Sequence, residues 1–240
     1  MPIKFENVFK SFGPKKILDG ISFHVQTGEI LFILGKSGTG KSVTLENIIG
    51  LLKSDAGTIE IDNMRVDNLT EEALSPVRKM CGMVFQHPAL LDSLSVYENI
   101  GFGLRGNAPE KIRARILECL ALVHLEESVL QRKPPEISYG MQKRVSLART
   151  IAPSPRYLLF DEPTTGLDPI TTNAINELIY ELSRKLKVTS IVVSHDMGCA
   201  LRIADRILIL DQGKVLAVGS VNDIKQNESP LIQDFLKEAV

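Results

Sequence analysis

The segment ILFILGKSGTGKS at residues 30–42 combines the residue types that bind phosphate groups. Glycines let the chain curl closely around an anion, so that several backbone N–H groups point inward, and a helix beginning here would add its dipole. Lys41 is suited to the β- and γ-phosphates, and the Ser42 hydroxyl to Mg²⁺. A chance glycine-rich turn is the alternative, and the bare pattern arises in about one chain of this length in a hundred. We predict a nucleotide phosphate loop formed by Gly35, Lys36, Ser37, Gly38, Thr39, Gly40, Lys41, Ser42 and Val43.

A second chemical site is predicted where the run YLLF at residues 157–160 ends in two carboxylates, Asp161 and Glu162. Adjacent strand residues point to opposite faces, and α/β sheets bind ligands at the C-terminal edge of their strands. Asp161 is suited to hold Mg²⁺ through water, and Glu162 to polarise an attacking water. Such a pair is by itself more often a solvated strand end. The phosphate loop upstream favours the catalytic interpretation.

These two sites require strands and helices to position them. Apolar runs rich in β-branched residues recur along the chain, and those at 30–34, 158–160 and 191–193 are nearly all apolar, as in central strands of a parallel sheet. Helix-compatible segments separate them, which favours a layered α/β fold with crossover helices. The predicted strands lie within residues 29–35, 57–62, 81–86, 156–163, 188–196 and 206–220.

Two places are predicted to be antiparallel. One is the N-terminal pair IKFENVFKSF and ISFHV, and the other is the pair joined at Asp211-Gln212-Gly213, which is a good hairpin turn. Residues 88–155 differ from the rest because they show no clear strand pattern. Helical spacing is followed there by Ile112, Ile116, Leu117, Leu120 and Val123. We predict a mostly helical insertion between the third and fourth core strands.

Composition limits the possible classes of protein. The 240 residues are 44% hydrophobic and 24% charged with a net charge of −1, so no global basic field draws the chain to nucleic acid or anionic lipid. No apolar run approaches the roughly 18 residues that span a bilayer, and the N-terminus has no secretory signal pattern. The three cysteines, Cys81, Cys119 and Cys199, are far apart and suggest neither a disulfide framework nor a zinc knuckle. We expect a cytosolic protein whose membrane contact comes through a partner.

In their order, these segments resemble the nucleotide-binding domain of ATP-binding cassette (ABC) transporters over almost all 240 residues. Phe12 in FKSFG matches the aromatic residue that stacks on adenine. Gln86 in MVFQHP matches a glutamine that touches Mg²⁺ and faces the membrane partner. His195 matches the histidine that senses the γ-phosphate. Taken singly, these residues are a core phenylalanine, a solvated strand-end glutamine and a satisfied strand-end histidine, but their shared order favours the functional roles.

The same resemblance assigns roles to two further loops. ISYGM at residues 137–141 matches the signature loop, in which Ser138 and Gly140 would contact the ATP of an opposing subunit. TGLD at residues 165–168 matches a loop that crosses between subunits, with Asp168 carrying information between two ATP sites. The resemblance therefore implies a homodimer that hydrolyses ATP. Mg²⁺ would be held by Ser42, Gln86 and Asp161, and the catalytic residues would be Lys41, Glu162 and His195.

The implied fold is a P-loop NTPase domain of the α/β class. It has a RecA-like, mostly parallel sheet, an N-terminal antiparallel β subdomain and an inserted α-helical subdomain. The chain is predicted to be one domain, residues 1–240, with a catalytic core at 1–87 and 156–240 and a helical subdomain at 88–155 that carries the signature loop. Two transmembrane permease subunits are expected as partners, with no nucleic acid, at the cytoplasmic face of the inner membrane.

A narrower resemblance is to the Mla-type lipid-transport ATPases. It rests on PALLDSLSVYENIGFGLR following Gln86, on DPITTNAINELI at 168–179, on Met141, and on the tail SPLIQDFLKEAV at 229–240. It implies phospholipid transport between bacterial membranes with an Mce-domain lipid-binding protein. The alternatives are an ABC importer ATPase for amino acids or osmolytes, or a non-transport ABC ATPase for iron–sulfur assembly or DNA repair. A DNA-repair type would carry a long coiled-coil insertion or basic stripes, whereas the insertion here is short.

Two surface features remain open at this point. An apolar set, which consists of Leu90, Leu91, Leu94, Val96 and Tyr97, is equally compatible with docking of the permease and with packing of the helical part. Tyr139 occupies a signature-loop position where the family carries glycine. If that position needs a positive φ, the tyrosine costs about 1 kcal/mol or more; otherwise its ring lies over the surface.

Overall fold

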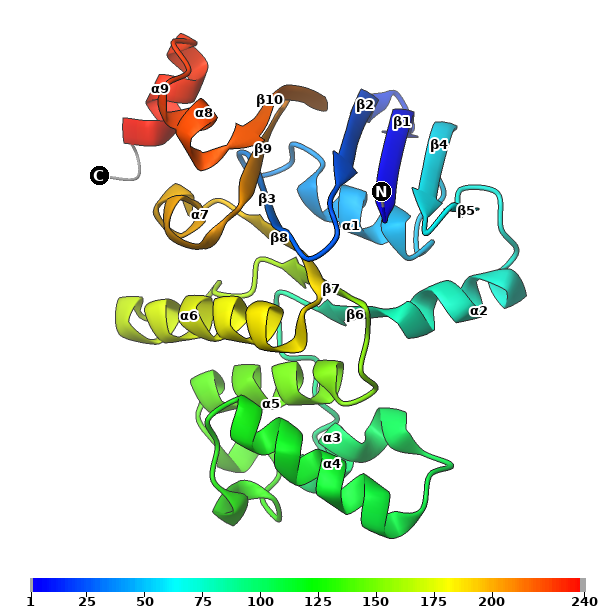
Figure 1. Ribbon diagram of the computed structural model, residues 1–240, viewed down its shortest axis with the longest axis vertical. Helices are drawn as coiled ribbons and strands as arrows, with labels where there is room; N and C mark the ends of the chain where they lie inside the picture. Colours follow the sequence, from blue (N-terminus) through cyan, green and yellow to red (C-terminus); the bar gives the residue numbers. More distant parts are fainter. Residues whose placement is uncertain (1, 238–240) are drawn as a thin grey trace.

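The aliphatic run Ile30–Leu34 forms β3, and all five of its side chains are buried because the strand lies inside a six-stranded sheet. The computed structural model describes residues 2–237 (Figure 1). The strand order of this sheet is β10-β9-β3-β8-β7-β6. All neighbours are parallel except β10 (Lys214–Ser220) and β9 (Arg206–Asp211), which form the predicted hairpin. The remaining strands are β6 (Cys81–Val84), β7 (Tyr157–Asp161) and β8 (Thr189–Ser194).

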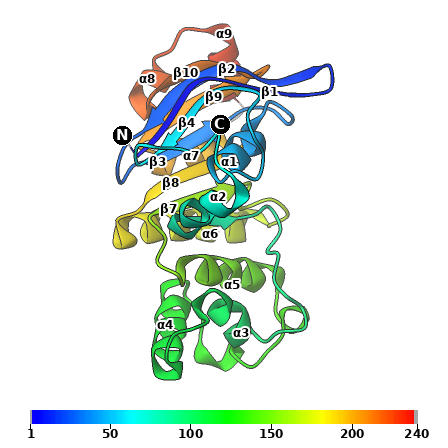
Figure 2. The ribbon, with the colours of Figure 1, turned by 90° about the vertical axis from the view of Figure 1, so that its right-hand side faces the viewer.

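A second, antiparallel sheet packs against one face of the first, with the order β2-β1-β4-β5 (Figure 2). Its strands are β1 (Ile3–Phe12), β2 (Lys15–Val25), β4 (Ala56–Ile61) and β5 (Met64–Arg65). The mixed sheet and the N-terminal antiparallel sheet confirm the predicted fold class. The count of core strands before the helical insertion is wrong by one, because residues 57–62 belong to this sheet and not to the parallel sheet. Thr58 and Glu60 alternate with the buried Ile59 and Ile61, the pattern of a strand with one covered face.

The two faces of β3 belong to different hydrophobic clusters. Leu31 and Ile33 pack toward the antiparallel sheet, where the rings of Phe5 and Phe23 stack with centroids 4.5 Å apart. Phe32 and its even-numbered neighbours pack on the other face with residues of the long helix α6 (Pro169–Leu186). The strand period of two therefore builds both cores from one short segment. The end of β3, where the phosphate loop begins, is held from both sides.

Helices connect the strands of the parallel sheet. The first, α1 (Lys41–Ile48), begins at the end of the predicted phosphate loop. Most of the others begin at a side-chain N-cap, including Asp168 for α6 and Asp196 for α7 (Met197–Ile203). The remaining helices outside the insertion are α2 (Glu71–Met80), α8 (Val221–Lys225) and α9 (Pro230–Lys237). The last residues of the tail used for the narrower resemblance, 238–240, lie outside the described residues.

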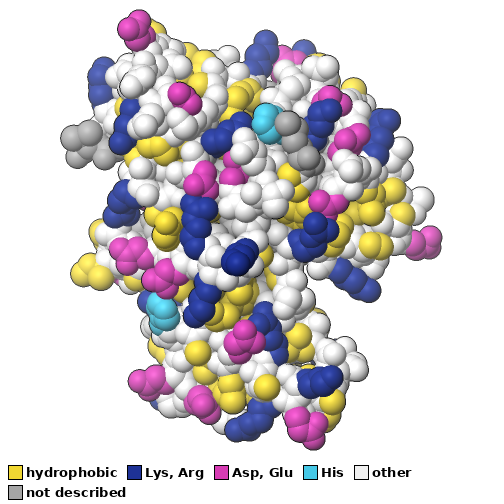
Figure 3. Space-filling view, in the orientation of Figure 1, with side chains coloured by type: hydrophobic (Ala, Val, Ile, Leu, Met, Phe, Trp, Pro, Cys, Tyr) yellow, Lys and Arg dark blue, Asp and Glu magenta, His cyan; other side chains and the backbone are white. Residues whose placement is uncertain are grey.

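The chain between β6 and β7 forms a separate layer of helices, seen at the bottom of Figure 1 and as a lobe in the space-filling view (Figure 3). It contains α3 (Val96–Gly101), α4 (Pro109–Leu122) and α5 (Tyr139–Ile151), with short 3₁₀ turns at Phe102–Leu104, Glu127–Val129 and Pro134–Glu136. The helical spacing predicted around Ile116 and Leu120 is confirmed, since both are buried on α4. Within residues 2–237, every helix is too short or too polar to cross a membrane.

Candidate functional site

The predicted phosphate loop joins β3 to α1 through a tight curl. Gly38 and Gly40 have φ angles of 79° and 103°, a region that favours glycine. A Cβ on Gly40 would lie 2.8 Å from the carbonyl oxygen of Ile17 on β2. The loop is therefore drawn against the neighbouring sheet, and only glycine permits that approach. The first helical residue is Lys41, so the N-terminus of α1 opens directly onto the loop.

The side chain of Lys41 is buried and folds back over this loop. Its Nζ donates hydrogen bonds to the carbonyl oxygens of Gly35, at 2.8 Å, and Lys36, at 3.1 Å. It also lies 3.6 Å from Oε1 of Glu162, which follows β7. One ammonium group thus links the phosphate loop to the predicted catalytic carboxylate. It places a positive charge where phosphate oxygens would enter.

The paired carboxylates at the end of β7 take different positions, as their alternation requires. Asp161 accepts a hydrogen bond of 2.8 Å from the Ser42 hydroxyl. Burial raises the pKa of Asp161, the nearby Glu162 charge raises it further, and the Ser42 and Lys41 contacts oppose this. A hydroxyl and a carboxylate side by side supply the oxygen ligands that Mg²⁺ prefers, and Mg²⁺ commonly takes its other ligands from phosphate and water. The donor set fits that ion.

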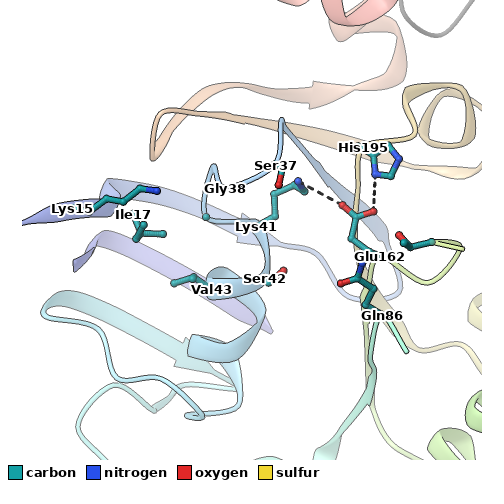
Figure 4. Close-up of a pocket in the computed structure, with 12 residues that line it drawn as sticks. Lys15, Ile17, Ser37, Gly38, Lys41, Ser42, Val43, Gln86, Glu162 and His195 are labelled. Carbon is teal, nitrogen blue, oxygen red and sulfur yellow. Dashed lines mark hydrogen bonds and ion pairs between the residues drawn. The ribbon is translucent and has the colours of Figure 1, made fainter. Parts of the chain in front are cut away.

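Glu162 lies between a lysine and a histidine (Figure 4). Its Oε2 is 2.8 Å from Nδ1 of His195, whose side chain is 70% exposed. The backbone of Glu162 has a φ of 45°, unusual outside glycine, and its N–H donates to the carbonyl of Val193 on β8 at 2.9 Å. This strained turn aims the carboxylate sideways from the strand end, toward the phosphate loop.

A cavity of about 460 Å³ brings these groups together. Of the predicted site residues, those lining it are Ser37, Gly38, Gly40, Lys41, Ser42, Val43, Gln86, Glu162 and His195. Lys15, Ile17 and Thr165 also line it and were missed by the sequence reasoning. Thr165 was within reach of that reasoning, because it stands in the TGLD motif. Lys15 and Ile17 reach the site only through the packing of β2 over the loop.

Gly35, Lys36, Thr39 and Asp161 support the cavity without lining it. Gly35 leaves no room for a side chain, since a Cβ would lie 2.6 Å from Oγ1 of Thr39. The same hydroxyl donates to the carbonyl of Lys36 at 2.9 Å, which holds the curl of the loop. Phe12 is 49% exposed near the end of β1, with the Lys10 ammonium 5.6 Å from its ring centroid. An exposed ring of this kind is able to stack on a planar base.

The signature loop and the crossing loop lie together at the starts of α5 and α6. Ser138 caps α5 by accepting from the backbone N–H of Met141 at 3.3 Å, and Asp168 caps α6 through the N–H groups of Ile170 and Thr171 at 3.0 Å. A Cβ on Gly140 would lie 3.0 Å from Thr171. These residues do not line the cavity of their own chain. Their polar groups are instead presented at the surface, beside the two helix N-termini.

Tyr139 adopts ordinary helical geometry, because it is the first residue of α5 and is not among the residues with positive φ. Its hydroxyl is 3.3 Å from Nδ1 of His87, and its ring lies beside Gly166. The tyrosine therefore causes no backbone strain at this position. Met141 is partly buried and packs against the hydrophobic core of the helical layer, which gives it a structural reason to be apolar.

The predicted apolar docking set divides between surface and core. Leu91 is 40% exposed, whereas Val96 is fully buried and Tyr97 packs partly against the core. The segment is held by the buried Asn99, whose amide donates to the carbonyls of Leu91, at 3.1 Å, and of two further residues, and accepts from the Leu91 N–H. Leu91 is thus presented at the surface by an ordered loop.

Comparison with known proteins identifies the family. The family model described as "ABC transporter" matches residues 18–165. The chain is 38% identical over 228 residues to the methionine import ATP-binding protein MetN of Carboxydothermus hydrogenoformans, covering 94% of this chain and 67% of that one. It is also 38% identical over 238 residues to MetN of Brucella abortus, covering 98% and 64%. The chain therefore spans about two thirds of the length of these relatives.

Solved structures agree with this assignment. The dimeric structure of MJ0796, a bacterial ABC transporter cassette, superposes with a TM-score of 0.83 at 35% identity, covering 91% of this chain and 98% of that one. The cbiO1 protein of Clostridium perfringens, part of the complex cbiONQ, gives a TM-score of 0.85 at 29% identity, covering 100% and 99%. A post-hydrolysis state of MJ0796 bound to ADP and Pi gives a TM-score of 0.82 at 34% identity, covering 91% and 98%.

The relatives overturn the prediction of phospholipid transport, and with it the Mla branch and the Mce-domain partner, because they are named methionine import proteins. The physical reason lies in where the matching segments are. Residues 88–105 and Met141 belong to the segment between β6 and β7 that contains the helical layer, and residues 168–179 belong to the crossing loop and α6. The resemblance gave these segments roles toward ATP and partner proteins rather than toward cargo, so similarity there carries little information about cargo. The fold, the phosphate loop and these relatives establish that the chain belongs to the ABC transporter family as an ATP-binding, ATP-hydrolysing subunit.

Proposed function

We propose that this chain powers an ABC importer whose cargo is methionine or a similar amino acid. The cavity that unites Lys41, Glu162 and His195 supports the ATPase part of the proposal. The cargo class is carried over from the relatives named methionine import proteins. It replaces phospholipid, and it matches the importer alternative that the sequence had left open.

ATP would enter the cavity with its phosphates on the loop of residues 35–43. Lys41 would exchange its bonds to the carbonyls of Gly35 and Lys36 for phosphate oxygens, since an ammonium gains more from an anion than from a neutral acceptor. The exposed ring of Phe12 would stack on adenine. Lys15, which lines the same cavity, would add a second positive charge at its edge.

A Mg²⁺ ion would be held by Ser42, Asp161 and Gln86 together with phosphate oxygens, and it would neutralise part of the phosphate charge. The chain prepares this site by pairing the Ser42 hydroxyl with Asp161. Because burial raises the pKa of Asp161, a cation beside it stabilises the ionised carboxylate.

Glu162 would act as the general base toward the attacking water. Its carboxylate is fixed between Lys41 and His195, so it cannot rotate away without losing both contacts. His195 is exposed on its other side and would face the γ-phosphate. Lys41 and His195 would hold the phosphate and the carboxylate of Glu162, and Glu162 would hold the attacking water in line with the phosphate. Positioning of this kind is the main contribution that a protein makes to phosphoryl transfer.

A second copy of the chain would complete each site. Ser138, Gly140 and Asp168 lie outside the cavity of their own chain but cluster at two exposed helix N-termini, which attract anions. In a head-to-tail dimer, the loop of Ser138 and Gly140 would cap the ATP of the opposing chain. Asp168 would then lie at the contact between the two sites.

Two permease subunits would hold this dimer at the cytoplasmic face of the inner membrane. The helical layer and the segment after Gln86 are the proposed docking surface, with Leu91 as its exposed apolar residue. We retain the division into a catalytic core at 1–87 and 156–240 and a helical subdomain at 88–155. The helical subdomain would then move when ATP binds or is hydrolysed, and this movement would be transmitted to the permease.

Reconstitution tests the whole proposal. The chain is combined in proteoliposomes with its permease and the matching substrate-binding protein, and ATP-dependent uptake of radiolabelled methionine is measured. Uptake should require ATP and should stop with Glu162→Gln. ATP hydrolysis without uptake of any amino acid would refute the cargo class and leave the ATPase assignment intact. A Leu91→Glu variant that co-purifies with the permease as well as wild type would refute the docking surface.

A further inference from the structure

The helix that carries the signature loop contains a buried lysine that the roles above do not use. Lys143 lies on α5 with 1% of its surface exposed. Its Nζ donates to the backbone carbonyl of Gln86, and no carboxylate of residues 2–237 forms an ion pair with it. Burial lowers the pKa of the Lys143 ammonium to about 8. A charged group has thus been placed inside the protein to bind one neutral oxygen.

The bond lies at the residue that leads from β6 into the cavity. Gln86 comes two positions after the last residue of β6, and its side chain lines the ATP cavity near Glu162 (Figure 4). The Lys143 bond spans 57 positions of sequence. The backbone at Gln86 is therefore anchored to α5, and its side chain is free to face the nucleotide.

Two neighbouring contacts extend this attachment. Arg149, also on α5, donates to the carbonyls of Ala89, at 2.8 Å, and Pro88, at 3.3 Å. Tyr139 lies one helical turn before Lys143, with its ring centroid 5.5 Å from the ammonium and its hydroxyl against His87. The segment that follows β6 is thus held along the helix by cations and an aromatic ring.

The free-energy cost of burying a charge argues against a role for Lys143 that consists of core packing alone. An uncompensated buried ammonium loses its hydration, and apolar residues of similar volume are commonly as stable or more stable at such positions. Lys143 stands among buried residues of α5, including Val145 and Leu147, that show what packing alone selects. Besides its contact with the Tyr139 ring, the Lys143 ammonium donates one hydrogen bond, and the acceptor is the backbone carbonyl of Gln86, a cavity residue.

We propose that Lys143 is a positioning residue for ATP hydrolysis: it fixes the backbone of Gln86 so that the amide side chain holds its place in the ATP cavity, and it joins that place to the signature helix. This inference rests on the proposed role of Gln86. Tyr139 supports the same arrangement by covering Lys143 and contacting His87. Tyr139, the unusual residue of the signature loop, would therefore have a structural role within its own chain.

A double-mutant cycle separates positioning from stability. ATP turnover of the full chain is measured with Mg²⁺ for wild type, Gln86→Ala, Lys143→Met and the double variant, and thermal unfolding is followed in parallel. Lys143→Met keeps the length of the side chain and removes its charge and donor. If Lys143 acts through Gln86, each single variant should reduce kcat about tenfold. The double variant should be no slower than Gln86→Ala, and the KM for ATP should stay within about twofold.

Arg149→Met is the matched control, because it removes a second cation of the same helix from the same segment. Its carbonyl partners lie beyond the cavity, so its turnover should stay within about twofold of wild type. Lys143→Arg, which keeps charge and donors, should recover part of the turnover and guards against misfolding of the methionine variant.

Each outcome decides between the claims. Wild-type turnover of Gln86→Ala would overturn the role of Gln86 and this inference with it. A slow Gln86→Ala beside a normal Lys143→Met would overturn the inference alone. Multiplicative effects in the double variant, or an equal loss with Arg149→Met, would mean that Lys143 only stabilises the fold.

Discussion

Replacing Glu162 by glutamine tests the catalytic site with little change of shape. The carboxylate lies 2.8 Å from His195 and 3.6 Å from Lys41. Glutamine keeps an oxygen that can accept from His195, and Lys41 keeps its hydrogen bonds to two loop carbonyls. The change therefore removes the basic group and leaves its neighbours partnered.

The expected size of the effect follows from that geometry. Loss of a general base slows turnover by about 10²- to 10⁴-fold, equivalent to about 3–5 kcal/mol in the barrier. The free energy of unfolding should change by no more than about 1 kcal/mol, because no buried polar group is left without a partner. ATP affinity should be equal or higher, since one negative charge beside the phosphates is gone. ATP-bound dimer should therefore accumulate.

Three measurements check this prediction. Phosphate release gives kcat, equilibrium titration with a fluorescent ATP analogue gives affinity, and size-exclusion chromatography with ATP shows the dimer. Glu177→Gln, the same substitution at an exposed position of α6, is the control and should behave as wild type. Turnover of Glu162→Gln within tenfold of wild type, with affinity and fold intact, would show that Glu162 is not the base.

Three further predictions concern other parts of the chain. Gly40→Ala should weaken ATP binding at least tenfold by fluorescent titration, because its φ of 103° and the 2.8 Å approach of a carbonyl oxygen exclude a Cβ; wild-type affinity would contradict this. Tyr157→Phe should destabilise the protein by about 1–3 kcal/mol in urea unfolding, since its hydroxyl donates to Asp62 at 2.6 Å. The hydrogen bond from Arg78 lowers the pKa of Glu71. The interaction between Arg78 and ionised Glu71 therefore stabilises the folded state above the ordinary pKa of 4.5, and this stabilisation is lost as the pH falls through the lowered pKa of the folded state. The difference in Tm between wild type and Glu71→Gln should vanish in acid.

Much of the fold and of the cavity could be predicted because it depends on residues that are neighbours in the chain. Gly35, Lys41 and Ser42 follow an apolar strand, and that spacing is sufficient to place them on one curled loop at a helix start. Asp161 and Glu162 end a second strand of the same sheet. Parallel strands bring their C-terminal ends to one edge, so the two sites had to meet.

Errors and omissions occurred where an assignment depended on packing between distant segments of the chain. Residues 57–62 were counted among the core strands, although the alternation of the buried Ile59 and Ile61 with Thr58 and Glu60 is typical of a strand with one covered face. Lys15 and Ile17 joined the cavity only because β2 crosses above the phosphate loop. The cargo was predicted from a resemblance in the helical layer, the crossing loop and the tail, and the relatives named methionine import proteins corrected it.

By itself, the sequence determined that this protein binds and hydrolyses ATP, because a phosphate loop is a local device built from backbone N–H groups, one lysine and one helix start. The tertiary structure decided what surrounds that device. It set Glu162 between Lys41 and His195, and it brought Lys143 to the carbonyl of Gln86 across 57 positions. Spacing along a chain fixes local geometry, whereas contacts between distant segments depend on how sheets and helices pack against one another.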